Sequence, residues 1–181
     1  MRPTLIAGGL ALAGLVAPSA VPMPPVLVWN ASASAPVGLY LVRPLPRPVR
    51  GVLAVIRLPE ANARFAAERG YLPLKAPLIK PVAAVAGQLV CQTKSGVAID
   101  GRLIGRSLKA DGSGRPLFAW SGCRVVFADE VFVMNPAVRD SFDGRYFGPL
   151  PASAVLGRAR PLWIRPSNSQ PQRSVSHDPD R

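Results

Sequence analysis

Residues 78–90 have the sequence Leu-Ile-Lys-Pro-Val-Ala-Ala-Val-Ala-Gly-Gln-Leu-Val, which is mostly apolar. Its apolar halves flank Gly87, which predicts a strand, a turn and a second strand. One charged side chain, that of Lys80, interrupts the apolar run. If Lys80 points inward, the loss of hydration lowers the pKa of its amine, and a neutral lysine can accept a proton from a serine hydroxyl. The alternative is an ordinary strand lysine that faces solvent.

Outward from this stretch, residues 26–165 predict one mostly β domain. The chain of 181 residues contains 21 prolines and 16 glycines, which leaves little room for long helices and suits short strands joined by turns. Short strands are expected at 26–29, 38–42, 51–57, 96–104 (a hairpin around Asp100-Gly101), 124–127 paired with 130–134, 154–159 and 162–164, with a helix at 60–69 and a polar loop at 108–116.

The amino-terminal segment, residues 1–25, predicts a signal anchor. Met1 and Arg2 precede an apolar run that starts at Leu5 and carries no charge up to Val21. A basic start before an apolar run is typical of secretory signals and anchors, and this run is at the short limit for a membrane-spanning helix. By the positive-inside rule Arg2 stays in the cytoplasm, so the rest of the chain is expected outside it. The alternative is a buried core helix.

Composition and charge limit which kinds of protein this chain can be and which kinds of partner it can bind. Hydrophobic residues make up 49% of the chain and charged residues 18%, which is too apolar for a disordered chain, although the polar residues 166–181 predict a disordered tail. The net charge of +12 suits nucleic acid, an anionic membrane surface, or a solvated surface without a partner. Scattered arginines without an aromatic platform favour an anionic phospholipid membrane and no nucleic acid. The single histidine, His177, lies near the end of the chain, so a Ser-His-Asp triad, a metal site and a cofactor are not expected.

A second stretch that can carry chemistry is Asn30-Ala-Ser-Ala-Ser-Ala-Pro-Val-Gly-Leu-Tyr40, between two expected strands. Pro36 and Gly38 stiffen and sharpen this turn, so that Ser34 can present its hydroxyl openly. A serine becomes a nucleophile when a nearby base takes its proton. The alternative is a plain turn, because serine, proline and glycine occur in most turns.

The third stretch is Asp140-Ser-Phe-Asp-Gly-Arg-Tyr-Phe-Gly-Pro149. On an extended strand Ser141, Asp143 and Arg145 share one face, because side chains alternate between the two faces. Asp143 can then pair with Arg145, and the Ser141 hydroxyl can hydrogen-bond a buried lysine amine and fix its direction. The alternative is a surface turn with an exposed ion pair.

Together the three stretches resemble motifs of the signal peptidase I superfamily, and within it the TraF-type peptidases of plasmid conjugation. The resemblance covers about 26–163. It departs from the family pattern at Pro81, where the family usually has arginine, at Ala86-Gly87-Gln88, where it has Pro-Gly-Asp, and at Gly144, where it has serine. It implies a β-rich domain of coiled antiparallel sheets on the periplasmic side of a bacterial inner membrane. It also implies a serine endopeptidase that cleaves a membrane-associated precursor, either a secreted preprotein or a conjugative pilin, with components of a conjugation or type IV secretion apparatus as possible partners.

The same resemblance implies a role for each polar residue of the three stretches. These roles are nucleophile for Ser34, general base for Lys80, oxyanion hole for the Ser32 hydroxyl and the Ser34 backbone N–H, orientation of the lysine for Ser141, and a structural ion pair for Asp143 and Arg145.

The two cysteines predict a disulfide. Cys91 and Cys123 are too few for a cysteine-only zinc site, and an even pair outside the cytoplasm can bridge. Because Cys91 follows the lysine strand and Cys123 ends a loop, the bridge is expected to tie the loop at 108–116 to the core. Two buried free thiols are the alternative for a cytosolic protein.

Two further functions remain open at this point. A cytosolic self-cleaving repressor shares a Ser/Lys fold, but it needs an amino-terminal DNA-binding domain where this chain has an apolar segment. A non-catalytic periplasmic assembly factor of a conjugation or type IV secretion apparatus could have the same fold without the chemistry. Substitution of Ser34 and Lys80 by alanine separates this second possibility from a peptidase.

Overall fold

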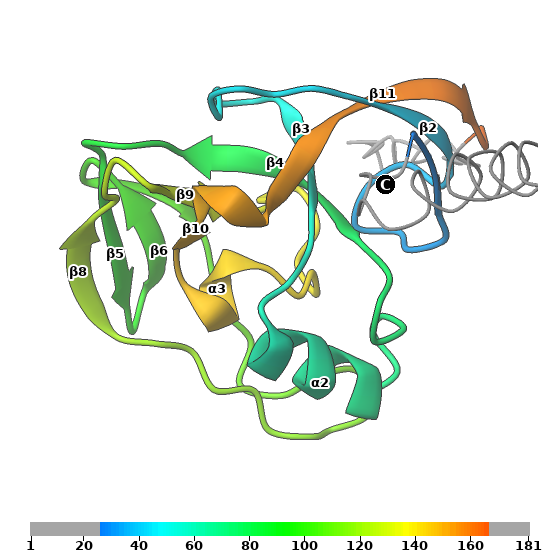
Figure 1. The fold of residues 1–181 in the computed structure, drawn as a ribbon. Helices are drawn as coiled ribbons and strands as arrows, with labels where there is room; N and C mark the ends of the chain where they lie inside the picture. Colours follow the sequence, from blue (N-terminus) through cyan, green and yellow to red (C-terminus); the bar gives the residue numbers. More distant parts are fainter. Residues whose placement is uncertain (1–25, 167–181) are drawn as a thin grey trace, which may run out of the picture.

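The computed structural model describes residues 26–166 of the chain (Figure 1). The expected anchor at 1–25 and all but the first residue of the expected tail at 166–181 lie outside the described residues. Across 26–166, no helix is both long enough and apolar enough to cross a membrane.

Two antiparallel sheets build the domain (Figure 1). The seven-stranded sheet has the order β1 (Leu27–Asn30), β2 (Gly38–Arg43), β11 (Val155–Ile164), β3 (Leu53–Ile56), β4 (Leu78–Ala84), β9 (Glu130–Val133) and β10 (Leu150–Pro151). The four-stranded sheet has the order β7 (Arg102–Gly105), β6 (Gly96–Ile99), β5 (Leu89–Thr93) and β8 (Gly122–Val125). The helices are α2 (Glu60–Glu68), α3 (Gly144–Phe147) and the short 3-10 helix η2 (Ala152–Ala154).

The mostly β fold with coiled antiparallel sheets and short helices is confirmed, and so are most of the expected turns. The chain turns at Gly87, which has a φ of +86°, between β4 and β5. Asp100 and Gly101 have φ values of +49° and +80° and join β6 to β7, as a two-residue hairpin turn requires. Helix α2 lies where a helix was expected.

Two strand predictions were wrong. The segment around β8 does not pair with β9, because β8 belongs to the four-stranded sheet and pairs with β5, whereas β9 pairs with β4 and β10. The reason lies in Val126, whose backbone N–H and carbonyl bond to Gln88 and Gly87 and so extend the pairing with β5. The two strands expected near the carboxyl end are one strand, β11, in which a register shift between Pro161 and Trp163 absorbs the proline, which has no N–H to donate.

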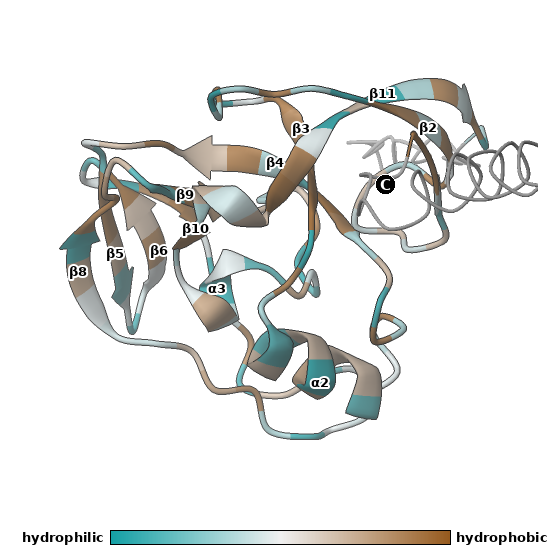
Figure 2. Ribbon diagram, in the orientation of Figure 1, coloured by the Kyte–Doolittle hydropathy of each residue, from teal (hydrophilic) through white to brown (hydrophobic). Residues whose placement is uncertain are grey.

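Strand β4 lies inside the larger sheet, between β3 and β9, and most of its residues are apolar (Figure 2). Leu78 and Val82 belong to a core cluster that contains Ile56, and Ile79 belongs to a second cluster that contains Tyr40. Because side chains alternate along a strand, Lys80 lies on the same face as Leu78 and Val82. The lysine therefore lies in an apolar layer.

Candidate active site

The loop that carries Ser34 is organised by the buried side chain of Asn30. Its Nδ2 atom donates to the carbonyl oxygens of Ser32, Ala35 and Pro36 at 2.9, 3.0 and 3.0 Å. Its Oδ1 atom accepts from the backbone N–H of Ser32 at 3.3 Å and from the Ser32 hydroxyl at 3.1 Å. One amide side chain thus satisfies several backbone groups and holds residues 31–36 in one shape.

The hydroxyls of Ser32 and Ser34 lie beside each other. Their Oγ atoms are 3.0 Å apart. Beyond them the loop enters β2 at Gly38, where a Cβ atom would lie 2.1 Å from the carbonyl oxygen of Trp163. Only glycine allows this close approach between β2 and β11, which fixes the point where the loop ends.

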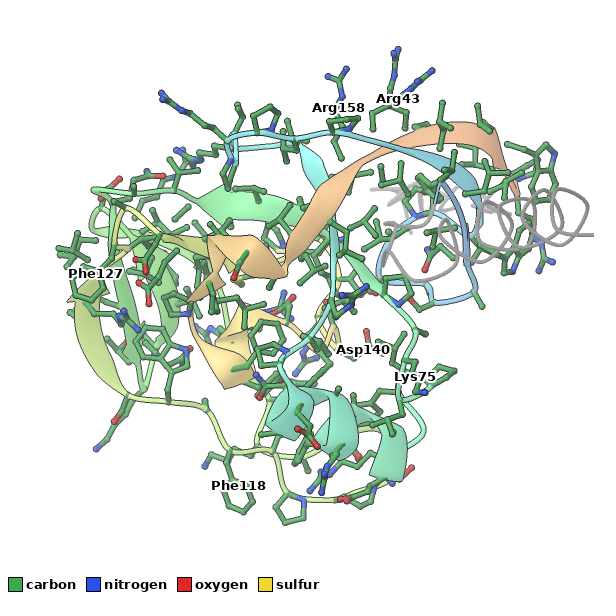
Figure 3. All side chains as sticks on the ribbon, in the orientation of Figure 1. Arg43, Lys75, Phe118, Phe127, Asp140 and Arg158 are labelled. Carbon is green, nitrogen blue, oxygen red and sulfur yellow. A yellow bond between two sulfur atoms is a disulfide. The ribbon has the colours of Figure 1, made fainter. Side chains whose placement is uncertain are left out.

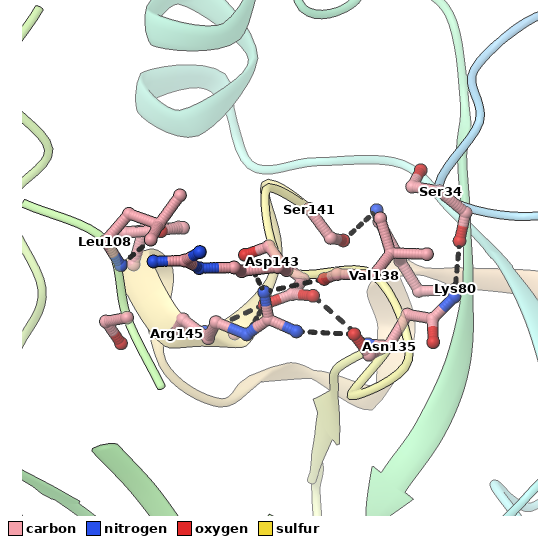
Figure 4. Close-up of polar contacts among 12 residues, drawn as sticks. Ser34, Lys80, Leu108, Asn135, Val138, Ser141, Asp143 and Arg145 are labelled. Carbon is pink, nitrogen blue, oxygen red and sulfur yellow. Dashed lines mark hydrogen bonds and ion pairs between the residues drawn. The ribbon is translucent and has the colours of Figure 1, made fainter. Parts of the chain in front are cut away.

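The amine of Lys80 is buried and hydrogen-bonded. The residue is 1% exposed, and its Nζ atom donates to the Ser141 hydroxyl at 2.5 Å (Figure 4). Burial lowers the pKa of Lys80 from 10.5 to about 8, and the positive charge of Arg145 adds to this, whereas the carboxylate of Asp143 opposes it. A neutral amine is therefore available near neutral pH, as a general base requires.

Asp143 and Arg145 form a buried pair, with exposures of 0% and 1%. Arg145 Nε lies 3.5 Å from Asp143 Oδ1, and its guanidinium donates to the carbonyls of Val138 and Arg139 at 2.9 and 2.8 Å. Burial raises the pKa of Asp143, and Arg145 opposes that shift. The pair holds the 135–145 segment against the core.

The extended strand expected for this segment was wrong. Asp143 is the N-cap of α3 and accepts from the backbone N–H of Arg145, so the chain turns into a helix between the two residues. Ser141 nevertheless points to Lys80 (Figure 4). The exposed ion pair considered as an alternative does not occur, because both side chains are buried.

Asn135 was missed by the sequence analysis. Its Nδ2 atom donates to the backbone carbonyl of Ser34 at 2.7 Å, and its backbone N–H donates to Asp143 Oδ2 at 3.1 Å (Figure 4). Its backbone carbonyl accepts from Arg145 Nη2. A single asparagine in a loop carries no periodicity or motif that would indicate a contact with a residue 101 positions away.

These residues line one cleft. A cavity of about 260 Å³ is bordered by Ser32, Ser34, Lys80 and Ser141. Its other walls are mainly apolar and are formed by Leu72, Leu78, Leu108, Leu117, Val138 and Phe142, with Tyr71, Tyr146 and Asp140 among the polar members. The cleft therefore offers a hydroxyl and a buried amine to a substrate that also contacts apolar surface.

Comparison with known proteins gives the family. The model of the signal peptidase family, peptidase S26, matches residues 2–164. The chain belongs to the signal peptidase S26 family. It is 42% identical over 141 residues to a probable conjugal transfer protein TraF of Sinorhizobium fredii, covering 72% of this chain and 73% of that one. It is 40% identical over 144 residues to a conjugal transfer protein TraF of Agrobacterium tumefaciens, covering 74% of this chain and 80% of the relative.

Among solved structures, a signal peptidase I of Enterococcus faecalis V583 aligns with 63% of the chain and 97% of its own length, at 18% identity and a TM-score of 0.37. A similarity this weak assigns nothing to the site. Membership of the S26 family, in contrast, supports a peptidase-like role with precursor proteins as the class of substrate, and the TraF relatives support a relation to conjugation.

In this S26 domain one wall of the cleft is a fastened loop, residues 108–117. At one end the Leu108 backbone N–H donates to the Tyr146 hydroxyl at 3.0 Å. Within the loop, the Asp111 carboxylate accepts from the Tyr71 hydroxyl and from Arg115 Nε, the latter at 2.8 Å. These bonds tie the loop to α3 and to the segment after α2, so that the wall keeps its shape.

A disulfide joins Cys91 and Cys123 on neighbouring strands β5 and β8. The two cysteines are direct partners in the register of these strands. The bridge spans 32 positions and encloses the loop 108–117. The S26 domain thus anchors this wall of its cleft covalently at the base.

Proposed function

We propose that this chain is a membrane-associated serine endopeptidase that cleaves precursor proteins, with Ser34 as nucleophile and Lys80 as general base. The single observation that supports this most strongly is the placement of a buried amine with a lowered pKa in the same cleft as a loop serine. Surface lysines keep their charge and cannot act as bases at neutral pH, whereas a desolvated one can.

In the first step Lys80 takes the proton from Ser34 Oγ as this oxygen attacks the carbonyl carbon of the scissile peptide bond. The carbonyl oxygen becomes negative and is stabilised by the Ser34 backbone N–H and the Ser32 hydroxyl, which lies 3.0 Å from Ser34 Oγ. Each such donor can contribute about 3 kcal/mol to the transition state. Ser141, bonded to Lys80 Nζ, orients the amine.

In the second step the tetrahedral intermediate collapses and the C–N bond breaks. Lys80 returns its proton to the leaving amine, and the acyl group stays on Ser34 Oγ as an ester. Lys80, neutral again, then removes a proton from water, or from a substrate amine, which attacks the ester. The ester C–O bond breaks, and Lys80 returns this proton to Ser34 Oγ, so that both groups regain their starting states. The products are two peptides with water as the acceptor, or a new amide bond when an amine is the acceptor.

The class of substrate is a precursor protein held at a membrane, either a preprotein or a pilin precursor. Family membership supports the precursor class, and the names of the TraF relatives support the link to conjugation. The apolar lining of the cleft suits an extended segment with apolar side chains before the cut.

An exposed aromatic face supports the membrane as the second partner. Trp29 and Trp163 are 53% and 50% exposed, and their rings stack with centroids 5.7 Å apart. Both pair in register with Leu39 of β2, so the two rings flank this strand on one face of the sheet. Tryptophan is the residue that membrane interfaces prefer, because its ring is amphipathic.

Arginines continue the same face of the sheet. Arg43 lies four residues after Leu39 on β2 and pairs with Arg158 on β11. Figure 3 shows the two side chains projecting together from the ribbon into solvent. Aromatic rings beside a row of cations suit anionic phospholipid headgroups.

Tryptophan fluorescence tests the membrane contact locally, whatever residues 1–25 do. The chain has three tryptophans. The third, Trp120, lies away from this face and donates its indole N–H to the Gly144 carbonyl oxygen in a hydrogen bond of 2.9 Å. Vesicles of brominated phosphatidylglycerol should quench the fluorescence of Trp29 and Trp163 in a Trp120→Phe variant. They should leave the fluorescence of Trp120 unchanged in a variant in which Trp29 and Trp163 are both replaced by phenylalanine. Equal quenching of all three rings would contradict the assignment of this face.

Processing of a precursor in membranes tests the enzymatic role. Membranes that contain the protein should shorten a pilin precursor or a preprotein, and membranes with Ser34→Ala or Lys80→Met at the same protein level should not. If both variants still process the precursor, the peptidase role is wrong and a non-catalytic assembly role is favoured.

A further inference from the structure

We infer that Asn135 is a positioning residue that holds the nucleophile loop against the base, an inference that rests on the function proposed above. Asn135 touches neither the scissile bond nor Lys80 in this mechanism. It acts through Ser34, whose backbone carbonyl accepts a 2.7 Å hydrogen bond from Asn135 Nδ2.

The other hydrogen bonds of the nucleophile loop are local. Asn30 bonds the carbonyls of Ser32, Ala35 and Pro36, and the Tyr40 hydroxyl donates to Pro36 at 2.7 Å. These bonds fix the shape of the loop without fixing its position relative to the base. Among the hydrogen bonds of residues 26–166, the one from Asn135 joins this loop to the 135–145 segment that carries Ser141.

The other end of the link is rigid. The backbone of Asn135 donates to Asp143 and accepts from Arg145, both of which are buried. Ser141 lies in the same segment and bonds the amine of Lys80. The segment therefore holds the base through Ser141 and the nucleophile through Asn135, which sets the distance between the two (Figure 4).

The consequence for catalysis follows from the peptide that is held. A hydrogen bond to the Ser34 carbonyl fixes the plane of the peptide after Ser34, and with it the direction of the Ser34 backbone and side chain. Reacting atoms must stay within a near-attack geometry, and a displacement of about 1 Å can lower the rate about 100-fold. Loss of the Asn135 donor should therefore lower kcat and change KM little, because the apolar walls of the cleft are unchanged.

Two substitutions isolate the donor from the other contacts of Asn135. Its backbone bonds to Asp143 and Arg145 persist whatever the side chain is. Its Oδ1 atom accepts from the Ala137 backbone N–H at 3.1 Å, a bond that Asn135→Asp keeps and Asn135→Ala loses. Both variants lose the donor to Ser34, so an effect common to both belongs to that bond.

The test measures kcat, KM and the pH profile of precursor cleavage by the full chain in membranes or detergent. Asn135→Ala and Asn135→Asp should each lower kcat about 10- to 100-fold with KM within about threefold of the wild type. The midpoint of the acid limb should stay the same in Asn135→Ala, since Lys80 keeps its surroundings, and the unfolding midpoint should stay close to that of the wild type. Asn62→Asp, on α2 and away from the site, is the matched control for the added charge and should leave kcat unchanged.

Three results would overturn the role of Asn135. The first is a wild-type kcat in either variant. The second is a loss of kcat confined to Asn135→Ala, which would assign the effect to the bond with Ala137. The third is a loss of kcat that matches the fraction of the variant that is unfolded. Ser34→Ala separates this inference from the proposed function. If Ser34→Ala is inactive while the Asn135 variants are fully active, only the positioning role fails, and if Ser34→Ala is active, the proposed function fails.

Discussion

Replacing Lys80 by methionine should stabilise the folded protein while it abolishes cleavage. The lysine is 1% exposed, and burial lowers its pKa from 10.5 to about 8, which means that the folded state disfavours its charge. Each pKa unit corresponds to about 1.4 kcal/mol, so holding the charged amine in this site costs about 3 kcal/mol at neutral pH. Methionine has a similar length, carries no charge and suits the apolar layer of Leu78 and Val82.

Part of this gain is offset, because Ser141 loses its hydrogen bond to Lys80 Nζ, a change worth about 1 kcal/mol. The free energy of unfolding of Lys80→Met should therefore exceed that of the wild type by about 2 kcal/mol at pH 7. A gain in stability from the loss of a proposed catalytic group is expected where a site holds a charge against its surroundings.

The pH dependence of this difference has a definite sign. Below pH 8 the Lys80 amine is protonated in both the folded and the unfolded wild type, so the folded state bears the full free-energy cost of burying its charge. Between pH 8 and 10.5 the folded state releases this proton before the unfolded chain does, and the wild type gains stability relative to the variant. The advantage of Lys80→Met should therefore shrink as the pH rises through this window.

Urea unfolding at pH 7, 9 and 10, followed by circular dichroism with the disulfide intact, measures the difference. Lys94→Met, in the exposed turn between β5 and β6, is the matched control and should be neutral within about 0.5 kcal/mol at each pH. A Lys80→Met protein that is no more stable than the wild type at pH 7, or whose advantage does not change with pH, would refute the idea that burial lowers the pKa of Lys80.

Three other expectations concern the rate and the disulfide. The rate of cleavage should fall as the pH drops below about 8. Asp140→Asn should shift the midpoint of this fall toward lower pH, because the Asp140 carboxylate raises the pKa of Lys80, and an unchanged midpoint would contradict this. Ser32→Ala should lower kcat about 100-fold with little change in KM, as measured by initial rates, and an unchanged kcat would remove Ser32 from the oxyanion hole. A double Cys91→Ser, Cys123→Ser variant should lose about 3 kcal/mol of unfolding free energy in urea, since the bridge spans 32 positions, and a loss below about 1 kcal/mol would contradict this.

Much of the fold follows from local sequence signals. The hairpin at Asp100-Gly101 and the turn at Gly87 are set by residues that accept a positive φ, and the sequence marks both. The helix at α2 follows from a run without glycine or proline. Such signals act over a few residues, which is why single-sequence reasoning reaches them.

The choice of strand partners is different, because it depends on the whole molecule. The segments around β8 and β9 are adjacent and apolar, which suggests a hairpin, yet Val126 binds the Gly87 turn and directs β8 to the smaller sheet. The helix α3 has four residues, too few to show helical periodicity. It forms because Asp143 caps it and because Arg145 is satisfied by the backbone of the preceding loop.

The candidate site likewise contains residues that the sequence indicates and residues that only the tertiary fold reveals. Lys80 stands out in the sequence because a single charge interrupts an apolar run, and its burial follows from the position of β4 between two other strands, β3 and β9. The stretches that contain Ser34 and Asp140 are each compatible with an ordinary turn, and they indicate an active site only in combination with Lys80. Asn135 has no such signal, since its contact with Ser34 is created by the tertiary fold.

The protonation of Lys80, on which its role as a base depends, can be observed by NMR. The chain has only four lysines, so a protein labelled at the lysine Cε carbon gives few NMR signals, and the signal that disappears in Lys80→Met belongs to Lys80. That signal should titrate with a midpoint near pH 8. A Lys80 signal that titrates above pH 10 would mean that almost none of the amine is neutral at neutral pH, and Lys80 would then be too rarely free of its proton to take one from Ser34.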